Sequence, residues 1–266
     1  MVDIRQSKDY TRYLSSLGWI VERIKNTNYF IKKFPLIGSV IKIQRPEKIY
    51  FKKIKTLAKK YRAFQIILEP KDDKQKEEIK KNGFRLSNSP YLPTKTLELN
   101  LTKPEKDLLK NLKKDCRSIV KKSKVKIVKT SPEKFQGVWK KAVGFKRYVP
   151  QIPQLESLKK TFGKNCLFIT TYDYSAGAIF LRADKKSYYW QAFTNKDGRR
   201  NNYQYKIVWE GILWAKKLGA KVFDFEGIYD ERFPNKSWLG FTHFKKSFGG
   251  NEIIYPGCYI KFRLPI

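Results

Sequence analysis

The order of apolar and polar positions predicts helices and strands along the whole chain. Apolar residues three and four positions apart indicate amphipathic helices, whereas alternation or a short apolar run indicates a strand. Helices are expected at residues 6–17, 48–61, 74–82, 132–143, 155–162, 205–218 and 238–246, with one more after Pro104. Strands are expected at residues 19–24, 29–33, 39–43, 64–68, 96–101, 125–129, 167–172, 177–183, 188–194, 222–225 and 253–259. The mixture predicts an α/β or α+β protein.

The helix expected after Pro104 has a strongly basic side. Thr102 and Glu105 have the spacing of a capping box, and Pro104 suits an early helical position because its missing N–H costs nothing there. One side of the helix is apolar, with Leu108, Leu109, Leu112, Cys116, Ile119 and Val120. The other side carries Lys110, Lys113, Lys114, Arg117, Lys121 and Lys122.

Part of the pattern repeats. Residues 58–69 align with residues 215–226 at an offset of 157 positions, and the same offset places Gly83-Phe84 on Gly240-Phe241. A helix, a buried strand, a second helix and a Gly-Phe pair therefore recur in the same order. The repeat predicts a duplication into two similar halves, residues 1–130 and 131–266, with the last strands able to pack on the first half.

The charge balance calls for an anionic partner. The 266 residues include 58 Lys and Arg against 24 Asp and Glu, which gives a formal net charge of +34. Nucleic acid is the first candidate, since phosphate backbones bind such surfaces with release of counterions. An anionic membrane surface is the second candidate, and phosphate-bearing small substrates are the third. A surface that is simply rich in lysine remains the plainer explanation.

Other residue counts exclude several classes of site. Three scattered cysteines do not make a disulfide framework or a zinc module. A single histidine, His243, excludes a multi-histidine metal site and disfavours a Ser-His-Asp triad. No apolar run approaches the roughly 20 residues that span a bilayer, and the first residues lack the apolar region of a signal peptide. We therefore expect a cytoplasmic protein without a metal or cofactor.

Aromatic residues and arginines are concentrated in the third quarter of the chain. Tyr189, Trp190 and Tyr205 lie close in sequence to Arg199 and Arg200. Such a set suits a groove that stacks bases or sugars while cations hold phosphate. The competing interpretations are a sheet core for the aromatic residues and a solvated turn for the two arginines.

Two further segments carry candidate chemistry. Asp224 lies in a buried strand and Glu226 follows it, so either carboxylate could act as a general base, although a buried Asp paired with a lysine is the alternative. In residues 241–250 (FTHFKKSFGG), Phe244 and Lys245 precede the pair Gly249-Gly250. A lysine beside an aromatic wall could stabilise an oxyanion, and the glycines could let the backbone approach a ligand closely.

Several of these segments resemble the Fem family of peptidoglycan-bridge aminoacyltransferases, which includes the lipid II:glycine glycyltransferases. In the second half they are residues 188–190 (YYW), 205–212 (YKIVWEGI) with Ala215-Lys216, 223–228 (FDFEGI), 244–245 (FK) and 248–250 (FGG). In the first half the resemblance is weaker and rests on Gln6-Ser7 with Tyr10, residues 93–99 (PTKTLEL), and residues 108–113 (LLKNLK) with Arg117.

The resemblance implies two tandem GNAT-like (N-acetyltransferase-like) domains, here without a coiled-coil insertion. It also implies transfer of an amino acid from aminoacyl-tRNA to an amine on the stem peptide of UDP-MurNAc-pentapeptide or lipid II. By the same resemblance Phe244 and Lys245 are expected to lie at the aminoacyl end of tRNA. Arg199 or Arg200 is expected to bind the precursor together with Tyr205. Tyr189, Trp190, Gly249 and Gly250 are expected around the substrates. The basic residues Lys113, Lys114, Arg117, Lys121 and Lys122 are expected to bind tRNA.

In this scheme Lys245 stabilises the oxyanion or the departing ribose oxygen, and Asp224 or Glu226 accepts the proton. The sequence departs from the family at two positions. Leu14 stands where a lysine is usual, and Glu226 stands at the first glycine of the family's Asp-x-Gly-Gly motif. An acyl-CoA-dependent N-acetyltransferase is one alternative, but its Arg/Gln-x-x-Gly-x-Gly/Ala loop is missing from the sequence. A non-catalytic, basic RNA-binding protein is the other. Transient contact with the inner membrane surface is also expected.

Overall fold

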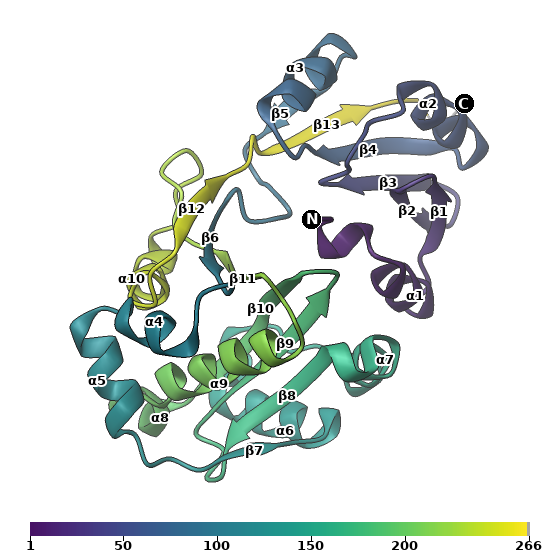
Figure 1. The fold of residues 1–266 in the computed structure, drawn as a ribbon. Helices are drawn as coiled ribbons and strands as arrows, with labels where there is room; N and C mark the ends of the chain where they lie inside the picture. The colour runs from purple at the N-terminus through teal and green to yellow at the C-terminus, as the bar shows by residue number, and fades with distance from the viewer. Residues whose placement is uncertain (265–266) are drawn as a thin grey trace. The chain divides into compact units, whose positions relative to one another are not determined.

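The computed structural model describes residues 1–264, which form two compact units (Figure 1). The six-stranded unit consists of residues 2–95 and 229–236 and the chain from residue 253 onward. The seven-stranded unit consists of residues 96–228 and 237–252, together with Met1. Each unit has a mixed sheet with helices packed on it, as the pattern of apolar residues predicts.

The six-stranded unit has the strand order β1-β2-β3-β4-β13-β5. Buried residues of the sheet and of α2 and α3 form its main core. Its strands are β1 (Ile20–Ile24), β2 (Thr27–Phe34), β3 (Gly38–Gln44), β4 (Ala63–Glu69), β5 (Arg85–Ser87) and β13 (Cys258–Phe262). Its helices are the 3₁₀ turn η1 (Ile4–Gln6), α1 (Lys8–Ser16), α2 (Phe51–Lys60) and α3 (Asp73–Lys81).

The seven-stranded sheet has the order β12-β6-β11-β10-β9-β8-β7. Helix α9 packs on β8, β9 and β10 with α5 against it, and α6 contacts β8 and β10 (Figure 1). The strands are β6 (Lys95–Asn100), β7 (Ile127–Lys129), β8 (Cys166–Thr171), β9 (Ala176–Ala183), β10 (Lys186–Thr194), β11 (Val222–Gly227) and β12 (Asn251–Ile254). The α-helices are α4 (Glu105–Lys110), α5 (Lys114–Lys122), α6 (Pro132–Val143), α7 (Ile152–Phe162), α8 (Lys196–Arg200), α9 (Tyr203–Lys217) and α10 (Leu239–Lys246). The 3₁₀ turns are η2 (Gly144–Lys146), η3 (Gly163–Asn165) and η4 (Lys236–Trp238).

The two sheets repeat one topology. In each, antiparallel strands lead into a parallel pair joined by a helix, namely β3–α2–β4 and β10–α9–β11. An antiparallel strand then follows on the far side, β13 beside β4 and β6 beside β11. The alignment of residues 58–69 with residues 215–226 falls on the α2–β4 and α9–β11 segments. The second match does not correspond in structure, because Gly83 follows α3 with a positive φ of 78° whereas Gly240 lies inside α10.

The division between the units falls near residue 95 and not near residue 130. Strand β6 pairs with β11, and the apolar side of α4 and α5, including Leu108 and Val120, enters the core of the seven-stranded unit. The basic helix is also shorter than expected. Pro104 is the N-cap of α4 without a side-chain cap, and the helix breaks before Lys113, whose N–H donates to the Ser247 carbonyl at 2.9 Å.

Candidate functional site

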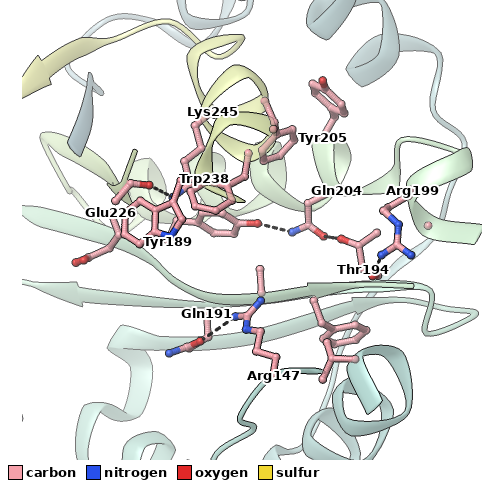
Figure 2. A pocket seen from close by; sticks show the side chains of 18 of the residues that line it. Arg147, Tyr189, Gln191, Thr194, Arg199, Gln204, Tyr205, Glu226, Trp238 and Lys245 are labelled. Atoms are coloured by element: carbon pink, nitrogen blue, oxygen red, sulfur yellow. Dashed lines mark hydrogen bonds between the residues drawn. The ribbon is translucent and has the colours of Figure 1, made fainter. Parts of the chain in front are cut away.

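The site begins where β10 and β11 separate. These parallel strands pair only from Lys186 and Val222 to Tyr188 and Asp224, although β10 continues to Thr194. A cavity of about 920 Å³ is lined by residues from beyond these last paired positions (Figure 2). Ligands of open α/β sheets bind outside the carboxyl ends of parallel strands, so the separation of β10 and β11 creates a ligand-sized space in the expected place.

A bulge in β10 shapes one wall of the cavity. The register between β10 and β9 shifts between Tyr189 and Gln191, which leaves Trp190 as the extra residue. Side chains of a regular strand alternate between its two faces, and a bulge interrupts that alternation. As a result, Tyr189, Trp190 and Gln191 all line the cavity.

Lys245 of α10 lies in the wall of this cavity, with only 8% of its surface exposed. Its Nζ donates a hydrogen bond to the carbonyl oxygen of Gly227 at 2.6 Å and lies 5.1 Å from the centre of the Phe241 ring. Burial lowers the pKa of Lys245 to about 8, while the carboxylates of Glu226 and Asp224 partly oppose this change. Lys245 is therefore a buried cation inside the cavity and not a surface lysine on a capped helix.

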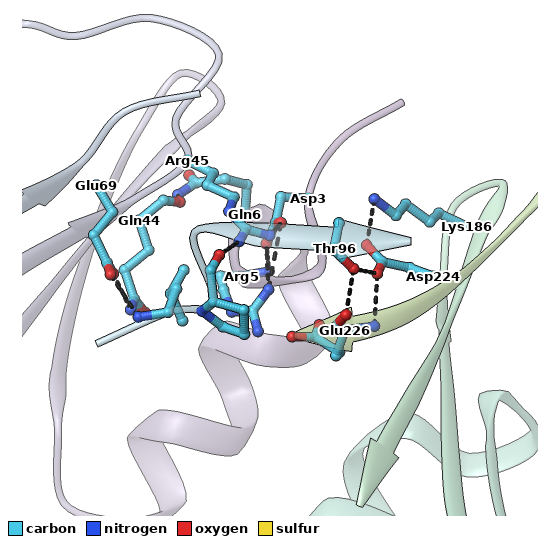
Figure 3. A network of polar contacts seen from close by, with 12 residues as sticks. Asp3, Arg5, Gln6, Gln44, Arg45, Glu69, Thr96, Lys186, Asp224 and Glu226 are labelled. Carbon is cyan, nitrogen blue, oxygen red and sulfur yellow. Dashed lines mark hydrogen bonds and ion pairs between the residues drawn. The ribbon is translucent and has the colours of Figure 1, made fainter. Parts of the chain in front are cut away.

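Asp224 is buried next to the cavity and is held by several polar partners. Its side chain is 1% exposed and forms an ion pair with Lys186 Nζ at 2.7 Å (Figure 3). It also accepts hydrogen bonds from the Thr96 hydroxyl and, at 2.7 Å, from the Glu226 N–H. Asp224 is not among the residues that line the cavity, and its pairing with Lys186 is the alternative that the sequence left open.

Glu226 is the carboxylate that reaches the cavity. The register between β11 and β6 shifts between Asp224 and Gly227, and Glu226 adopts a positive φ of 57°. Such a conformation is uncommon for a residue other than glycine and recurs where a bulge redirects a side chain. The single proton of the Thr96 hydroxyl is shared between the Asp224 carboxylate and the Glu226 carbonyl oxygen, which lies 2.6 Å away, so Thr96 and Asp224 together hold the bulge.

The structure separates Arg199 from Arg200. The expected turn contains the short helix α8, whose first turn is capped by the Asn195 side chain. Arg199 lines the cavity and donates from Nη1 to the Thr194 carbonyl at 2.7 Å (Figure 2). Both arginines are exposed, but Arg200 is not among the lining residues.

Tyr205 and Phe244 line the cavity together. Their rings meet edge to face, with centroids 4.7 Å apart, and Tyr205 also stacks on Phe248 at 5.8 Å. Burial raises the pKa of Tyr205. This aromatic wall is rigid because each ring packs on the others.

Gly249 and Gly250 pack against other parts of the chain. Neither lines the cavity. A Cβ on Gly250 would lie 2.6 Å from the carbonyl oxygen of Glu98, and one on Gly249 would lie 3.3 Å from that of Asn111. The expected close approach is thus between two parts of this chain.

Sequence reasoning missed several lining residues. Gln204 donates from Nε2 to the Tyr189 hydroxyl at 2.7 Å and accepts from the Thr194 hydroxyl at 3.0 Å (Figure 2). Arg147 places its guanidinium within 3.4 Å of Gln191 Oε1. Arg147 comes directly after the 3₁₀ turn η2, outside the regular helices and strands. Arg199 and Arg200 were expected in a turn, so the same reasoning could have selected Arg147. Trp238, Phe241 and Ser237 also line the cavity.

The basic residues of α5 lie outside this cavity. Lys113, Lys114, Lys121 and Lys122 are exposed, whereas Arg117 is half-buried and donates to the Lys110 carbonyl at 2.8 Å. The expected basic face exists, and its cations are presented to solvent.

The equivalent position in the six-stranded unit is filled. There β3 and β4 stay paired as far as Gln44 and Glu69. The buried carboxylate of Glu69 accepts from Gln44 Nε2 at 2.7 Å and from the Leu92 N–H at 2.6 Å, and burial raises its pKa (Figure 3). The Arg45 N–H donates to the Glu69 carbonyl at 2.7 Å. Hydrogen-bonded groups around Glu69 therefore occupy the position that stays open between β10 and β11 in the other unit.

The described chain offers no metal site of the usual kind: within residues 1–264, no three His, Cys, Asp or Glu side chains lie close enough to hold an ion. The three cysteines are buried and form no disulfide bond. None of the helices in the same range has the length and apolar character to cross a bilayer.

Comparison with known proteins places the fold. No known protein family and no curated protein matches the chain. Among solved structures, FemX matches with a TM-score of 0.81 and 15% identity over 98% of this chain and 92% of the FemX chain. The C-terminal domain of a protein described as a lysylphosphatidylglycerol synthetase from Agrobacterium fabrum matches with a TM-score of 0.64 and 10% identity, over 97% of this chain and 88% of that one.

A tandem GNAT protein from the clavulanic acid biosynthesis pathway matches with a TM-score of 0.54 and 7% identity, over 90% of this chain and 81% of that one. The resemblance drawn from the sequence is therefore borne out at the level of the fold. The chain has two tandem GNAT-like domains, in the arrangement of strands and helices that FemX also has.

Proposed function

We propose that this chain is an aminoacyltransferase that moves an amino acid from aminoacyl-tRNA to an amine on the stem peptide of a peptidoglycan precursor, UDP-MurNAc-pentapeptide or lipid II. The observation that carries the proposal is the buried ammonium of Lys245 at the opening between β10 and β11. The fold shared with FemX and the basic surface support the choice of donor and acceptor.

The reaction needs little beyond positioning and charge stabilisation, because an amino acid esterified to ribose is already activated. The neutral amine of the acceptor attacks the ester carbonyl carbon, forming the C–N bond and a tetrahedral oxyanion. Collapse breaks the C–O bond to the ribose, and the proton lost by the amine ends on the departing ribose oxygen. No redox or metal-bound step is required.

Lys245 would stabilise the negative charge that develops on the tetrahedral oxyanion. A cation held away from water acts strongly on a nearby oxyanion, and its hydrogen bond to the Gly227 carbonyl fixes its direction. Glu226 is the lining carboxylate available to receive the proton of the attacking amine. Arg199 and Tyr205 lie along the cavity, where they would bind the anionic precursor.

The acyl-CoA alternative lacks its binding loop. The segments between β10 and α9 and between β3 and α2 are where a GNAT-type pyrophosphate loop would lie. The first segment contains helix α8 and a single glycine, Gly198. This glycine packs against the backbone of Ser175, since a Cβ added to Gly198 would lie 2.3 Å from the Ser175 carbonyl oxygen. The second, residues 45–50, contains no glycine.

The test is transfer of radiolabelled amino acid from a mixed pool of charged tRNAs to UDP-MurNAc-pentapeptide, lipid II and phosphatidylglycerol. Wild type is expected to label a peptidoglycan precursor, and Lys245→Met is not. Label on phosphatidylglycerol alone would replace the acceptor, and acetyl-CoA consumption without tRNA-dependent label would replace the donor. Tight tRNA binding with no label on any acceptor would favour the RNA-binding alternative.

A further inference from the structure

One end of the six-stranded sheet exposes large apolar side chains. The β2–β3 hairpin turns there through Pro35-Leu36-Ile37, β4 begins beside it, and β13 ends beside β4. Two contacts join these strands at that end, Ser39 N–H to the Arg62 carbonyl at 3.1 Å and Arg263 N–H to the Phe64 carbonyl at 2.9 Å. We call the apolar residues of this end the apolar tip: Phe34, Leu36, Ile37, Phe64, Phe262 and Leu264.

The hairpin turn has unusual residues for its place. Short hairpin turns favour Gly, Asn or Asp, which tolerate a positive φ. Here Leu36 has a φ of 65°, and its side chain is fully exposed. The Ile37 N–H donates to the Pro35 carbonyl at 2.8 Å, so the turn is held tightly with Leu36 projecting from it. Packing within the unit does not account for a leucine in this conformation.

The rest of the apolar tip is exposed as well. Ile37 is 59% exposed, Phe262 66% and Leu264 76%. Phe34 is 41% exposed and lies 6.0 Å from the ring of Phe64. Several exposed large apolar side chains at one end of a sheet are typical of a surface that binds an apolar partner.

The chain segments that form the tip are basic. Residues 30–43, 51–68 and 257–264 contain no Asp or Glu. Lys32 and Lys33 precede Phe34, Arg62 precedes β4, and Arg263 lies between Phe262 and Leu264. The occupant must therefore combine an apolar interior with an anionic surface. Nucleic acid lacks the first property, and a second copy of this chain would bring two sets of cations together.

We propose that the apolar tip docks this protein on an anionic lipid bilayer. Leu36 and Ile37 enter the boundary between headgroups and acyl chains, while Lys33 contacts lipid phosphates. The site is formed by a hairpin turn and the ends of neighbouring strands, and not by an amphipathic helix. The proposal does not depend on the transferase reaction.

Binding to sedimented vesicles tests the proposal. The full chain is mixed with vesicles of phosphatidylcholine alone and with vesicles that also contain phosphatidylglycerol, at low and high salt. Wild type is expected to bind the anionic vesicles and to lose binding in high salt. The double variant Leu36→Ser/Ile37→Ser should lower the partition coefficient by about tenfold or more. Tyr172→Ser, which removes an exposed aromatic residue from the other unit, should not change it.

A label placed at the tip separates insertion from simple charge attraction. The native cysteines are buried, so Leu36→Cys gives a single accessible thiol for an environment-sensitive fluorophore. Its emission should shift to the blue on anionic vesicles, whereas the same label at Ile254→Cys should not shift. Equal binding by Leu36→Ser/Ile37→Ser and wild type, or no blue shift, would overturn the proposal. A wild-type dimer that the double variant dissociates, without vesicle binding, would overturn it in favour of self-association.

Discussion

Lys245 and Asp224 act on opposite sides of one bulge in β11. Asp224 holds the bulge through the Glu226 N–H at 2.7 Å, and Lys245 donates to the next carbonyl, that of Gly227, at 2.6 Å. The direction of the buried ammonium therefore depends on a carboxylate that does not reach the cavity. This relationship distinguishes residues that would act on substrate from residues that position them.

Replacing Lys245 by Met should abolish transfer while stabilising the fold. Turnover is expected to fall by roughly 10²–10³-fold, the usual cost of removing one oxyanion partner. Below about pH 8 the Lys245 charge is buried in the folded chain, whereas the unfolded chain exposes it to water. For the pKa shift of Lys245, this burial lowers the free energy of unfolding by up to about 3 kcal/mol. The unpaired Gly227 carbonyl offsets about 1–2 kcal/mol of the gain. Single-turnover kinetics and urea unfolding measure the two effects.

The matched control is Lys246→Met. Lys246 is the next residue but is only half-buried and pairs with Glu252 at 2.5 Å, so its removal should change stability by about 0.5 kcal/mol or less and leave turnover intact. If both variants behave alike, the special role of Lys245 is wrong.

The pH dependence of stability should carry the signature of Lys245. Its pKa is lowered on folding, from 10.5 to about 8, so between these values the unfolded chain binds more protons than the folded chain. Stability from this group is therefore lowest below about pH 8 and rises as the pH increases toward 10.5. The gap in unfolding free energy between wild type and Lys245→Met should narrow over this range. A constant gap would contradict the lowered pKa.

The same pKa predicts how the rate depends on pH. A Lys245 that works as an ammonium should lose its effect as the pH rises above about 8. The rate of the chemical step at saturating substrate should then decline. A rate that continues to increase to higher pH would show that neutral Lys245 acts as a base.

Arg199 and Arg200 should differ as their positions do. Arg199→Ala is expected to raise KM for the precursor by about tenfold or more, because one charge-assisted contact to an anion in the cavity is lost. Arg200→Ala serves as the matched control and should leave KM within about twofold, since Arg200 is exposed outside the cavity. Steady-state kinetics with varied acceptor decides between them, and the reverse order would contradict the assignment.

Neutralising the two carboxylates should give opposite results. Asp224→Asn leaves Lys186 with Glu98 as its remaining acidic partner and should cost roughly 3 kcal/mol of stability. Glu226→Gln should lower kcat by roughly 10²-fold, with little loss of stability, because its side chain lines the cavity. Thermal unfolding and kcat are measured on both proteins. A stable Asp224→Asn protein with a large loss of kcat would restore Asp224 as the base.

The sequence predicts local features well and long-range ones poorly. Most amphipathic helices and alternating strands lie where the pattern of residues predicts, because burial of one face fixes them locally. The pairing of β6 with β11 has no local signal, since it depends on which strands pair across the fold, whereas the repeat already allowed the last strands to pack on the first half. The same holds for the bulges at Trp190 and Glu226, which exist only relative to the neighbouring strand. The separation of Arg199 from Arg200 likewise depends on helix α8, where a turn was expected.

Gly250 was expected beside a ligand, whereas the structure places it against the backbone of Glu98, and this contact yields the last prediction. Its φ is 104°, and a Cβ added there would lie only 2.6 Å from the Glu98 carbonyl oxygen, so Gly250→Ala should be destabilising by roughly 2 kcal/mol or more. Gly137→Ala is the control, because nothing lies within 4 Å of a Cβ there and alanine should stabilise helix α6 by up to about 1 kcal/mol. At a temperature where Gly250→Ala remains folded, KM for both substrates should match that of wild type. A large rise in KM with unchanged stability would instead place Gly250 against a ligand.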